Sequence, residues 1–231
     1  MPGQRGRSSQ DPTVHELQLV IFDCDGVLVD SERISNRVLA EMLTTEGLPT
    51  TLQEALAEYK GLLLSDTIAR AEAKLGRSLP EGWVAEYERD RIEAFRKELE
   101  PIPGAAAAVQ AITAAGIPVC VASQGKLSKT RLTLGLTGLR PLFPGGTLFS
   151  AWSVPRGKPH PDLFLHAAAV MGSKPAHCVV VEDMPSGVSA AVSAGMRVLG
   201  YTADSEEAAL RQAGAEVFRS LDELPSLLGL A

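Results

Sequence analysis

Two aspartates separated by one residue, Asp23 and Asp25, stand at the end of a short apolar run over residues 17–23. Side chains two positions apart in an extended chain point the same way, so both carboxylates can reach one site, and Gly26 then permits a sharp turn. Carboxylates this close repel each other unless one keeps a proton or a cation lies between them. Mg²⁺ is a suitable cation, because it binds oxygen ligands and fits a site that phosphate oxygens complete. A plain Asp-Gly turn after a strand explains the pattern equally well.

A second acidic pair, Glu182 and Asp183, directly follows the apolar run that begins at Cys178. Adjacent side chains diverge on a strand, so we expect Asp183 to face a metal more directly than Glu182. An acidic helix cap before Pro185 is the alternative for this pair taken alone. Two acidic strand ends in one chain favour a shared site, because neighbouring strand ends would bring them together.

A hydroxyl and a lysine lie at two further turns. Ser123 ends an apolar run and leads through Gln124, Gly125 and Lys126 into a helical pattern. A hydroxyl and backbone amides at a helix N-terminus form a phosphate-binding site, although a serine that merely caps the helix has the same geometry. Lys158 lies in a loop stiffened by prolines, which suits an ammonium fixed against carboxylates and phosphate. The alternative for Lys158 is a solvated surface lysine.

The surrounding pattern predicts the elements that position these residues. Short apolar runs alternate with helical patterns, which is typical of β-α units around a parallel sheet buried on both faces. The runs lie at residues 17–23, 117–123, 147–151, 178–183 and 196–200, and the helical patterns at 104–115, 126–136, 162–171 and 185–194. We therefore expect an α/β fold with a doubly wound, Rossmann-like parallel sheet.

Residues 32–101 interrupt this alternation with helical patterns and no convincing strand. The last pattern, at 84–100, is highly charged and is typical of a solvated helix face. An insertion directly after the first strand lies beyond the carboxyl edge of the sheet, where ligands bind in open α/β folds. We expect a flexible tail at 1–12, an α/β core at 13–31 and 102–231, and an all-helical cap at 32–101 that covers the site.

The overall composition excludes several partners. The 231 residues carry a net charge of −6, which gives no basic field for nucleic acid or an anionic membrane. No apolar run has the length of a membrane-spanning helix, and residues 1–12 lack the apolar core of a secretory signal. Cys24, Cys120 and Cys178 are odd in number and lie in apolar runs, which favours reduced, buried thiols in a cytoplasmic protein. A monomer and a small homo-oligomer are equally compatible with the sequence.

Together the four motifs resemble the haloacid dehalogenase-like (HAD) hydrolase superfamily, in the family's order and over residues 17–228. The resemblance implies that Asp23 is a nucleophile that attacks phosphorus and that Asp25 is the general acid and base. It also implies an Mg²⁺ cofactor bound by Asp23, the backbone carbonyl of Asp25, and Asp183, with Glu182 either binding the metal or orienting the other ligands.

The same resemblance assigns substrate contacts. Ser123, with the neighbouring Gln124 and Gly125, would hold phosphate oxygens, and Lys158 would balance charge between nucleophile and phosphoryl group. Closure of the helical cap would bring Lys60 and Gly61 to the leaving group. The sequence looks most similar to the family's bacterial sugar-phosphate phosphatases, which implies a small phosphorylated metabolite as partner.

Three other functions fit parts of the pattern. A sugar phosphomutase resembling β-phosphoglucomutase would share the core residues, but such relatives carry a histidine and an arginine where this chain has Ser35 and Leu64. A metal-free 2-haloacid dehalogenase has no need of Asp25. A non-catalytic binding protein would tolerate loss of an acid or of the lysine, and all of these are present.

Overall fold

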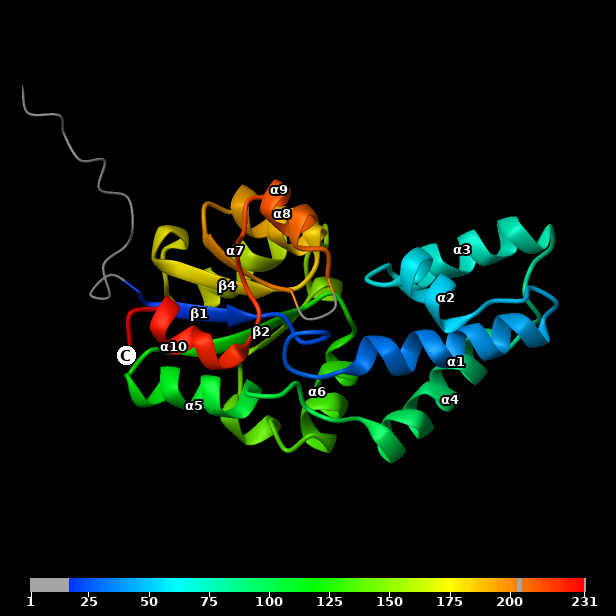
Figure 1. Ribbon diagram of the computed structural model, residues 1–231, viewed down its shortest axis with the longest axis horizontal. Coiled ribbons are helices and arrows are strands. Elements are labelled where there is room, and N and C mark those ends of the chain that lie inside the picture. Colours follow the sequence, from blue (N-terminus) through cyan, green and yellow to red (C-terminus); the bar gives the residue numbers. More distant parts are fainter. Residues whose placement is uncertain (1–16, 203–204, 231) are drawn as a thin grey trace, which may run out of the picture.

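The computed structural model describes residues 17–202 and 205–230 (Figure 1). The tail predicted at 1–12 lies outside these residues. Six parallel strands form one sheet in the order β3-β2-β1-β4-β5-β6. They are β1 (Leu19–Phe22), β2 (Val119–Ser123), β3 (Leu148–Ser150), β4 (Cys178–Glu182), β5 (Arg197–Tyr201) and β6 (Glu216–Phe218). The parallel sheet predicted from the alternating runs is confirmed.

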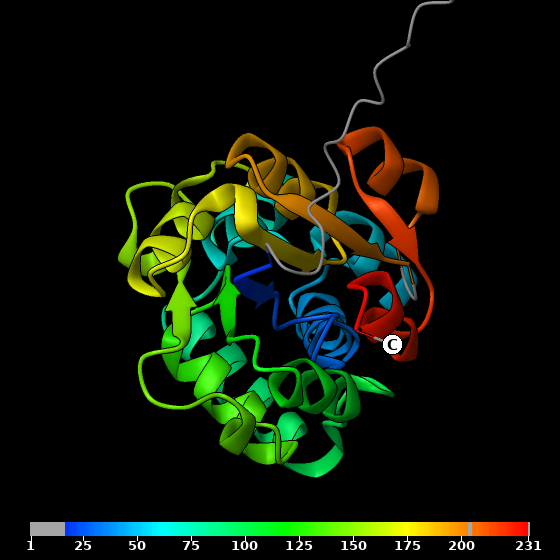
Figure 2. The same ribbon diagram turned by 90° about the vertical axis from the view of Figure 1, so that its left-hand side faces the viewer.

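Helices cover both faces of this sheet (Figure 2). On β1, Val20 and Phe22 pack into one core and Leu19 and Ile21 into the other, as strand alternation requires. The first core includes side chains of α5 (Ala105–Ala114), α6 (Leu127–Leu136) and α10 (Leu224–Leu227). The second includes side chains of α7 (Asp162–Val170), α8 (Pro185–Ser193) and α9 (Glu207–Ala213). Every residue of β1, β2 and β4 is buried, and these central strands are apolar except for Ser123 and Glu182 at their carboxyl ends.

Five helices stand between β1 and β2 in the chain, and the first four form a separate group beyond the carboxyl end of β1 (Figure 1). We call them the helical insertion: α1 (Ser31–Thr45), α2 (Leu52–Tyr59), α3 (Leu64–Leu75) and α4 (Trp83–Glu98). Residues 32–100, all of which are described, contain no strand, as predicted. The segments entering and leaving the insertion lie side by side, because Val29 pairs with Pro101 and the Ile102 amide donates to the Leu28 carbonyl at 2.9 Å.

The structure differs from the sequence prediction in several details. Most predicted elements are one or two residues too long, and the C-terminal elements α9, β6 and α10 were not predicted. Strand β6 is a three-residue edge strand with an exposed Glu216, so it has no apolar run to mark it. The remaining elements are 3₁₀ turns at η1 (Arg140–Leu142), η2 (Ala151–Ser153), η3 (Pro175–His177) and η4 (Leu221–Glu223).

Helix α4 has the solvated face that its charge pattern predicts, and it also has a buried face. Many of its charged residues are exposed, but Trp83, Tyr87 and Phe95 are buried, and the Trp83 and Tyr87 rings stack with centroids 5.8 Å apart. The three cysteines are free and buried, as expected. Within the described ranges, no helix combines the length and the apolar character that crossing a bilayer requires.

Candidate active site

The site begins where β1 ends. Asp23 follows Phe22, and its backbone amide donates to the Val181 carbonyl of β4 at 2.9 Å. Strand β1 lies between β2 and β4, so Asp23 stands in the middle of the carboxyl edge of the sheet. Glu182 and Asp183 end the neighbouring strand β4, and Ser123 ends β2 on the other side. Parallel strands therefore bring three sequence-distant motifs to one edge, as predicted.

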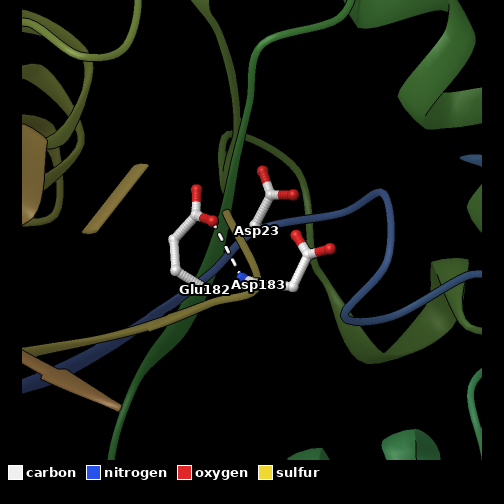
Figure 3. Close-up of side chains that lie close together, drawn as sticks. All are labelled: Asp23, Glu182 and Asp183. Atoms are coloured by element: carbon white, nitrogen blue, oxygen red, sulfur yellow. Dashed lines mark hydrogen bonds between the residues drawn. The ribbon is translucent and has the colours of Figure 1, made fainter. Parts of the chain in front are cut away.

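Three buried carboxylates gather at this edge: Asp23, Glu182 and Asp183 (Figure 3). Each offers an oxygen, and these oxygens all lie within 4.8 Å of one another. Glu182 is oriented by backbone donors, because its Oε2 accepts from the amides of Asp183 and Met184, each at 2.9 Å. A side chain on Gly187 of α8 would collide with the Glu182 carboxylate, so this glycine leaves the space that Glu182 occupies.

Lys158 lies between two of these carboxylates. Its Nζ donates to Asp23 Oδ1 and to Glu182 Oε1, each at 2.6 Å, and the lysine side chain is only 5% exposed. Burial alone would lower the pKa of Lys158, but the two carboxylates raise it well above the usual value. The loop is held in place by Gln124, whose Oε1 accepts from the Lys158 amide at 3.0 Å. The predicted fixed ammonium facing carboxylates is present.

The electrostatics of the acidic cluster favour a further cation. Burial raises the pKa of Asp23 despite the Lys158 contact, and burial raises the pKa of Asp183 to about 7 despite Lys60. Asp183 Oδ1 is buried and has no hydrogen-bond partner among the described residues. An oxygen-only set with an excess of negative charge and one unsatisfied carboxylate oxygen fits a divalent metal such as Mg²⁺.

Gly26, the residue after Asp25, allows the loop after β1 to lie close to Asp183 at the end of β4. Gly26 has a φ of +84°, and a Cβ there would collide with Asp183 Oδ2. The sharp turn predicted at Gly26 therefore also brings the loop after β1 against the end of β4.

Asp25 turns its carboxylate to other partners. Ser31 donates to its Oδ1, Lys129 Nζ lies 2.9 Å from the same oxygen, and Ser123 donates to its Oδ2 at 3.3 Å. Burial would raise the pKa of Asp25, but the Lys129 ammonium and the Ser31 hydroxyl outweigh it and hold that pKa below its ordinary value. The Asp25 side chain is not part of the three-carboxylate cluster.

The residues after β2 form a linked turn. Ser123 is buried, and its Oγ accepts from the Gly125 amide at 3.0 Å. The Gly125 carbonyl in turn accepts from Ser150 Oγ at 2.6 Å. Gln124 uses its side chain to hold the Lys158 loop, so in this state it positions the lysine. The predicted phosphate contacts Ser123, Gln124 and Gly125 thus stand beside Asp25 and Lys158.

The loop after α2 reaches the cluster from the helical insertion. Lys60 Nζ lies 3.0 Å from Asp183 Oδ2 and 3.4 Å from Ser205 Oγ. Gly61 has a φ of +75°, and a Cβ there would collide with the Met184 side chain. Both residues therefore lie at the boundary between the insertion and the sheet edge.

A cavity of about 500 Å³ opens between the sheet edge and the helical insertion. Residues of both parts line it, and several were not singled out from the sequence, among them Tyr87, Arg91 and Lys129. Lys129 lies six positions after Ser123, a spacing too common to mark it, and Arg91 was hidden in the charged pattern of α4.

Comparison with known proteins was made on the whole chain. Residues 17–195 match the model of the haloacid dehalogenase-like hydrolase family. The 6-phosphogluconate phosphatase of Escherichia coli K12 is 34% identical over 212 residues, which cover 91% of this chain and 94% of that protein. Hexitol phosphatase A of the same organism is 33% identical, with 88% and 91% covered.

Solved structures resemble the chain over nearly its full length. A haloacid dehalogenase-like protein from Agrobacterium tumefaciens superposes with a TM-score of 0.80 at 33% identity, covering 92% of this chain and 98% of that chain. A HAD family hydrolase from Deinococcus radiodurans, solved with bound phosphate and sodium, gives a TM-score of 0.78 at 32% identity, with 93% and 97% covered.

Proposed function

The chain belongs to the haloacid dehalogenase-like hydrolases, and on that premise we propose that it is an Mg²⁺-dependent phosphomonoesterase acting on a sugar phosphate. The observation that carries the proposal is the buried position of Lys158 Nζ, 2.6 Å from both Asp23 and Glu182 and beside Asp183. Relatives named for phosphatases of 6-phosphogluconate and of hexitols support a small phosphorylated metabolite as the substrate class.

In the proposed reaction Asp23 is the nucleophile. One of its carboxylate oxygens attacks phosphorus, the bond from phosphorus to the ester oxygen breaks, and the phosphoryl group is held transiently on Asp23. Lys158 contacts this carboxylate, so its charge is placed to offset the negative charge of nucleophile and phosphoryl oxygens. Water then attacks the same phosphorus, which releases inorganic phosphate and restores the carboxylate.

Asp25 is the proposed proton carrier. It would give a proton to the leaving alcohol oxygen and later take one from the attacking water. Lys129 and Ser31 hold the pKa of Asp25 below its ordinary value in this structure. A phosphoryl group beside Asp25, which is present in both steps, would raise that pKa by repulsion and so favour proton uptake by Asp25.

The metal is assigned to the acidic cluster. Asp23, Glu182 and Asp183 would hold Mg²⁺, together with the backbone carbonyl of Asp25, and the unpartnered Asp183 Oδ1 supports this set. The bound ion would supply positive charge to the phosphoryl oxygens. Lys60, which now contacts Asp183, would be released toward the leaving group, with Gly61 beside it.

Substrate positioning is divided between two parts of the chain. Ser123, with the turn of Gln124 and Gly125, is proposed to hold phosphate oxygens from the sheet edge. We assign the described parts of residues 13–31 and 102–231 to the core and residues 32–101 to a cap that excludes bulk water from the cavity; residues 13–16, 203–204 and 231 lie outside the described residues. The ion pair between Lys126 after β2 and Glu88 of α4, at 2.9 Å, supports contact between the two parts.

Hydrolysis is favoured over the related reactions. The positions where mutase-like relatives carry a histidine and an arginine hold Ser35 on α1 and Leu64 at the start of α3, and neither can supply a proton or a cation. A metal-free dehalogenase would leave the paired roles of Asp25 and Asp183 without use.

The test is release of inorganic phosphate from a panel of sugar phosphates, polyol phosphates and nucleotides. We expect turnover of at least one sugar or polyol phosphate, loss of that turnover in EDTA, and recovery on adding Mg²⁺. Turnover that persists in EDTA would contradict the metal assignment. Isomerisation of a hexose 1-phosphate without net phosphate release would replace the hydrolase by a mutase.

A further inference from the structure

A charged side chain of the helical insertion, Arg91, lines the cavity without a carboxylate partner. No carboxylate oxygen within the described residues lies 4.0 Å or less from its guanidinium. Its Nε is buried and makes no hydrogen bond to another described residue. The residue is half-buried, and its buried Nε lacks the hydrogen bond that it would make in water, a cost that an acceptor on a ligand would remove.

The other cations around the cavity are already paired, which sets Arg91 apart. Their partners lie at 2.6–3.0 Å: Lys60 with Asp183, Lys126 with Glu88, Lys129 with Asp25, and Lys158 with Asp23 and Glu182. A ligand anion that meets Arg91 therefore has no protein carboxylate to displace.

Two aromatic rings hold the guanidinium in place. Tyr87, Arg91 and Phe95 are spaced by four residues on α4, so they share one helix face. The Arg91 Cζ lies 5.0 Å from the Tyr87 ring centroid and 6.0 Å from that of Phe95. Such flanking rings reduce the freedom of the side chain and keep its planar donors available to a carboxylate or phosphate.

Arg91 lines the cavity from α4 of the helical insertion, whereas Asp23, Asp25 and Lys158 line it from the sheet edge. Arg91 is therefore placed to meet a part of the substrate that extends from the transferred phosphoryl group toward the insertion. A second unpartnered buried atom, Ser35 Oγ, belongs to the same cavity wall. The volume of about 500 Å³ is ample for a six-carbon chain beyond the phosphoryl group.

We propose that Arg91 binds a second anionic group of the substrate, a carboxylate or a phosphate at the end remote from the transferred phosphoryl group. The inference rests on the proposed phosphatase function and narrows it to substrates with two anionic ends. A neutral polyol phosphate would leave the guanidinium without a counter-ion.

The test compares kcat/KM for three probes of similar length: 6-phosphogluconate, a hexitol 6-phosphate and a hexose 1,6-bisphosphate. The native enzyme should prefer one of the two doubly anionic probes to the hexitol phosphate. Arg91→Met should lower kcat/KM for that probe at least about tenfold more than for the hexitol phosphate, mainly through KM. Arg91→Lys keeps the charge but loses the planar fork, so it should retain part of the preference.

Arg89→Met is the matched control, because Arg89 lies on the same helix with a side chain 64% exposed. It should leave the preference unchanged. Equal losses on all probes in both Arg91 variants, or a native preference for the hexitol phosphate, would overturn the proposal. Hydrolysis of p-nitrophenyl phosphate distinguishes failure of the proposed phosphatase function from failure of the proposed role of Arg91. If the native protein does not hydrolyse this compound, the phosphatase function is wrong. If it does, a negative result with the three probes overturns only the role of Arg91.

Discussion

At the scale of single residues, the site is a balance of buried charges. Asp23, Glu182 and Asp183 face one another at the sheet edge, and Lys158 offsets part of their charge. Without Lys158, the buried carboxylates of Asp23 and Glu182 would lack this cationic partner in an environment of low dielectric constant. We therefore propose two roles for Lys158: it stabilises the buried carboxylates that it contacts, and it positions positive charge for the reaction.

Replacing Lys158 should have effects on turnover and stability that replacing an exposed lysine does not have. We expect Lys158→Met to lower kcat at least about 100-fold and to lower the free energy of unfolding of the metal-free protein, because two buried carboxylates lose their partner. Lys174→Met, at an exposed position, should change neither. Phosphate release and chemical denaturation in EDTA measure the two effects, and a Lys158 variant with native turnover would refute the assignment.

The residues at the strand ends could be predicted from the sequence, but those from helices could not. Asp23, Asp183 and Ser123 each follow an apolar run, and parallel strands must end at one edge. Lys129 and Arg91 reach the cavity only because α6 and α4 present particular faces to it. That rotation is set by tertiary packing, here by the burial of Tyr87 and Phe95.

At the scale of elements, the start of α8 shapes the site. Gly187 lies in its first turn, where a side chain would occupy the space of the Glu182 carboxylate. Helix α6 offers a comparison, because Gly135 is also helical and a side chain there would meet nothing within 4 Å. These two glycines separate the effect of site geometry from the general effect of glycine in a helix.

The pair of substitutions gives opposite expectations. Gly135→Ala should leave turnover unchanged and raise the free energy of unfolding by up to about 1 kcal/mol, since alanine favours the helix. Gly187→Ala should displace Glu182 from Lys158 and lower kcat at least about tenfold, with weaker Mg²⁺ binding. Activity assays and calorimetric titration with Mg²⁺ measure these effects, and equal behaviour of the two variants would contradict the role given to Glu182.

The order of elements was predictable where hydrophobic runs are clear, and less so at the edges. The central strands are buried throughout, so their apolar runs stand out. Strand β6 has three residues and an exposed Glu216, which leaves no such signal. The helical insertion was predicted from its lack of strands, but its packing over the sheet edge depends on contacts between distant residues, such as Lys60 with Asp183.

At the scale of the whole molecule, the acidic cluster couples stability to pH and metal. The folded-state pKa of Asp183 is raised to about 7 from an ordinary 3.8, so the folded protein binds this proton more tightly than the unfolded chain does. This contribution to stability is therefore lost as pH rises from about 4 to about 7. If Mg²⁺ binds at the proposed site, it binds the ionised carboxylates and should oppose this loss of stability at high pH.

We expect the melting temperature in EDTA to fall between pH 5 and pH 8, and the fall to be smaller in Asp183→Asn, which lacks this titration. Added Mg²⁺ should raise the melting temperature of the native protein more at pH 8 than at pH 5. Thermal melts of both proteins at the two pH values measure this. The coupling would be contradicted if the melting temperatures of the native protein and of Asp183→Asn changed by the same amount between pH 5 and pH 8.

The central claim is that Asp23 receives the phosphoryl group, and it is tested most directly by looking for that adduct. Asp25→Asn, mixed with Mg²⁺ and p-nitrophenyl phosphate and quenched in acid, should carry the mass of one phosphoryl group on the peptide that contains Asp23. The p-nitrophenolate leaving group needs no proton from Asp25, whereas the base for the second step is missing. The adduct should be absent from Asp23→Asn treated in the same way. A phosphoryl group found on another residue, or turnover by the Asp23 variant at the native rate, would contradict the account.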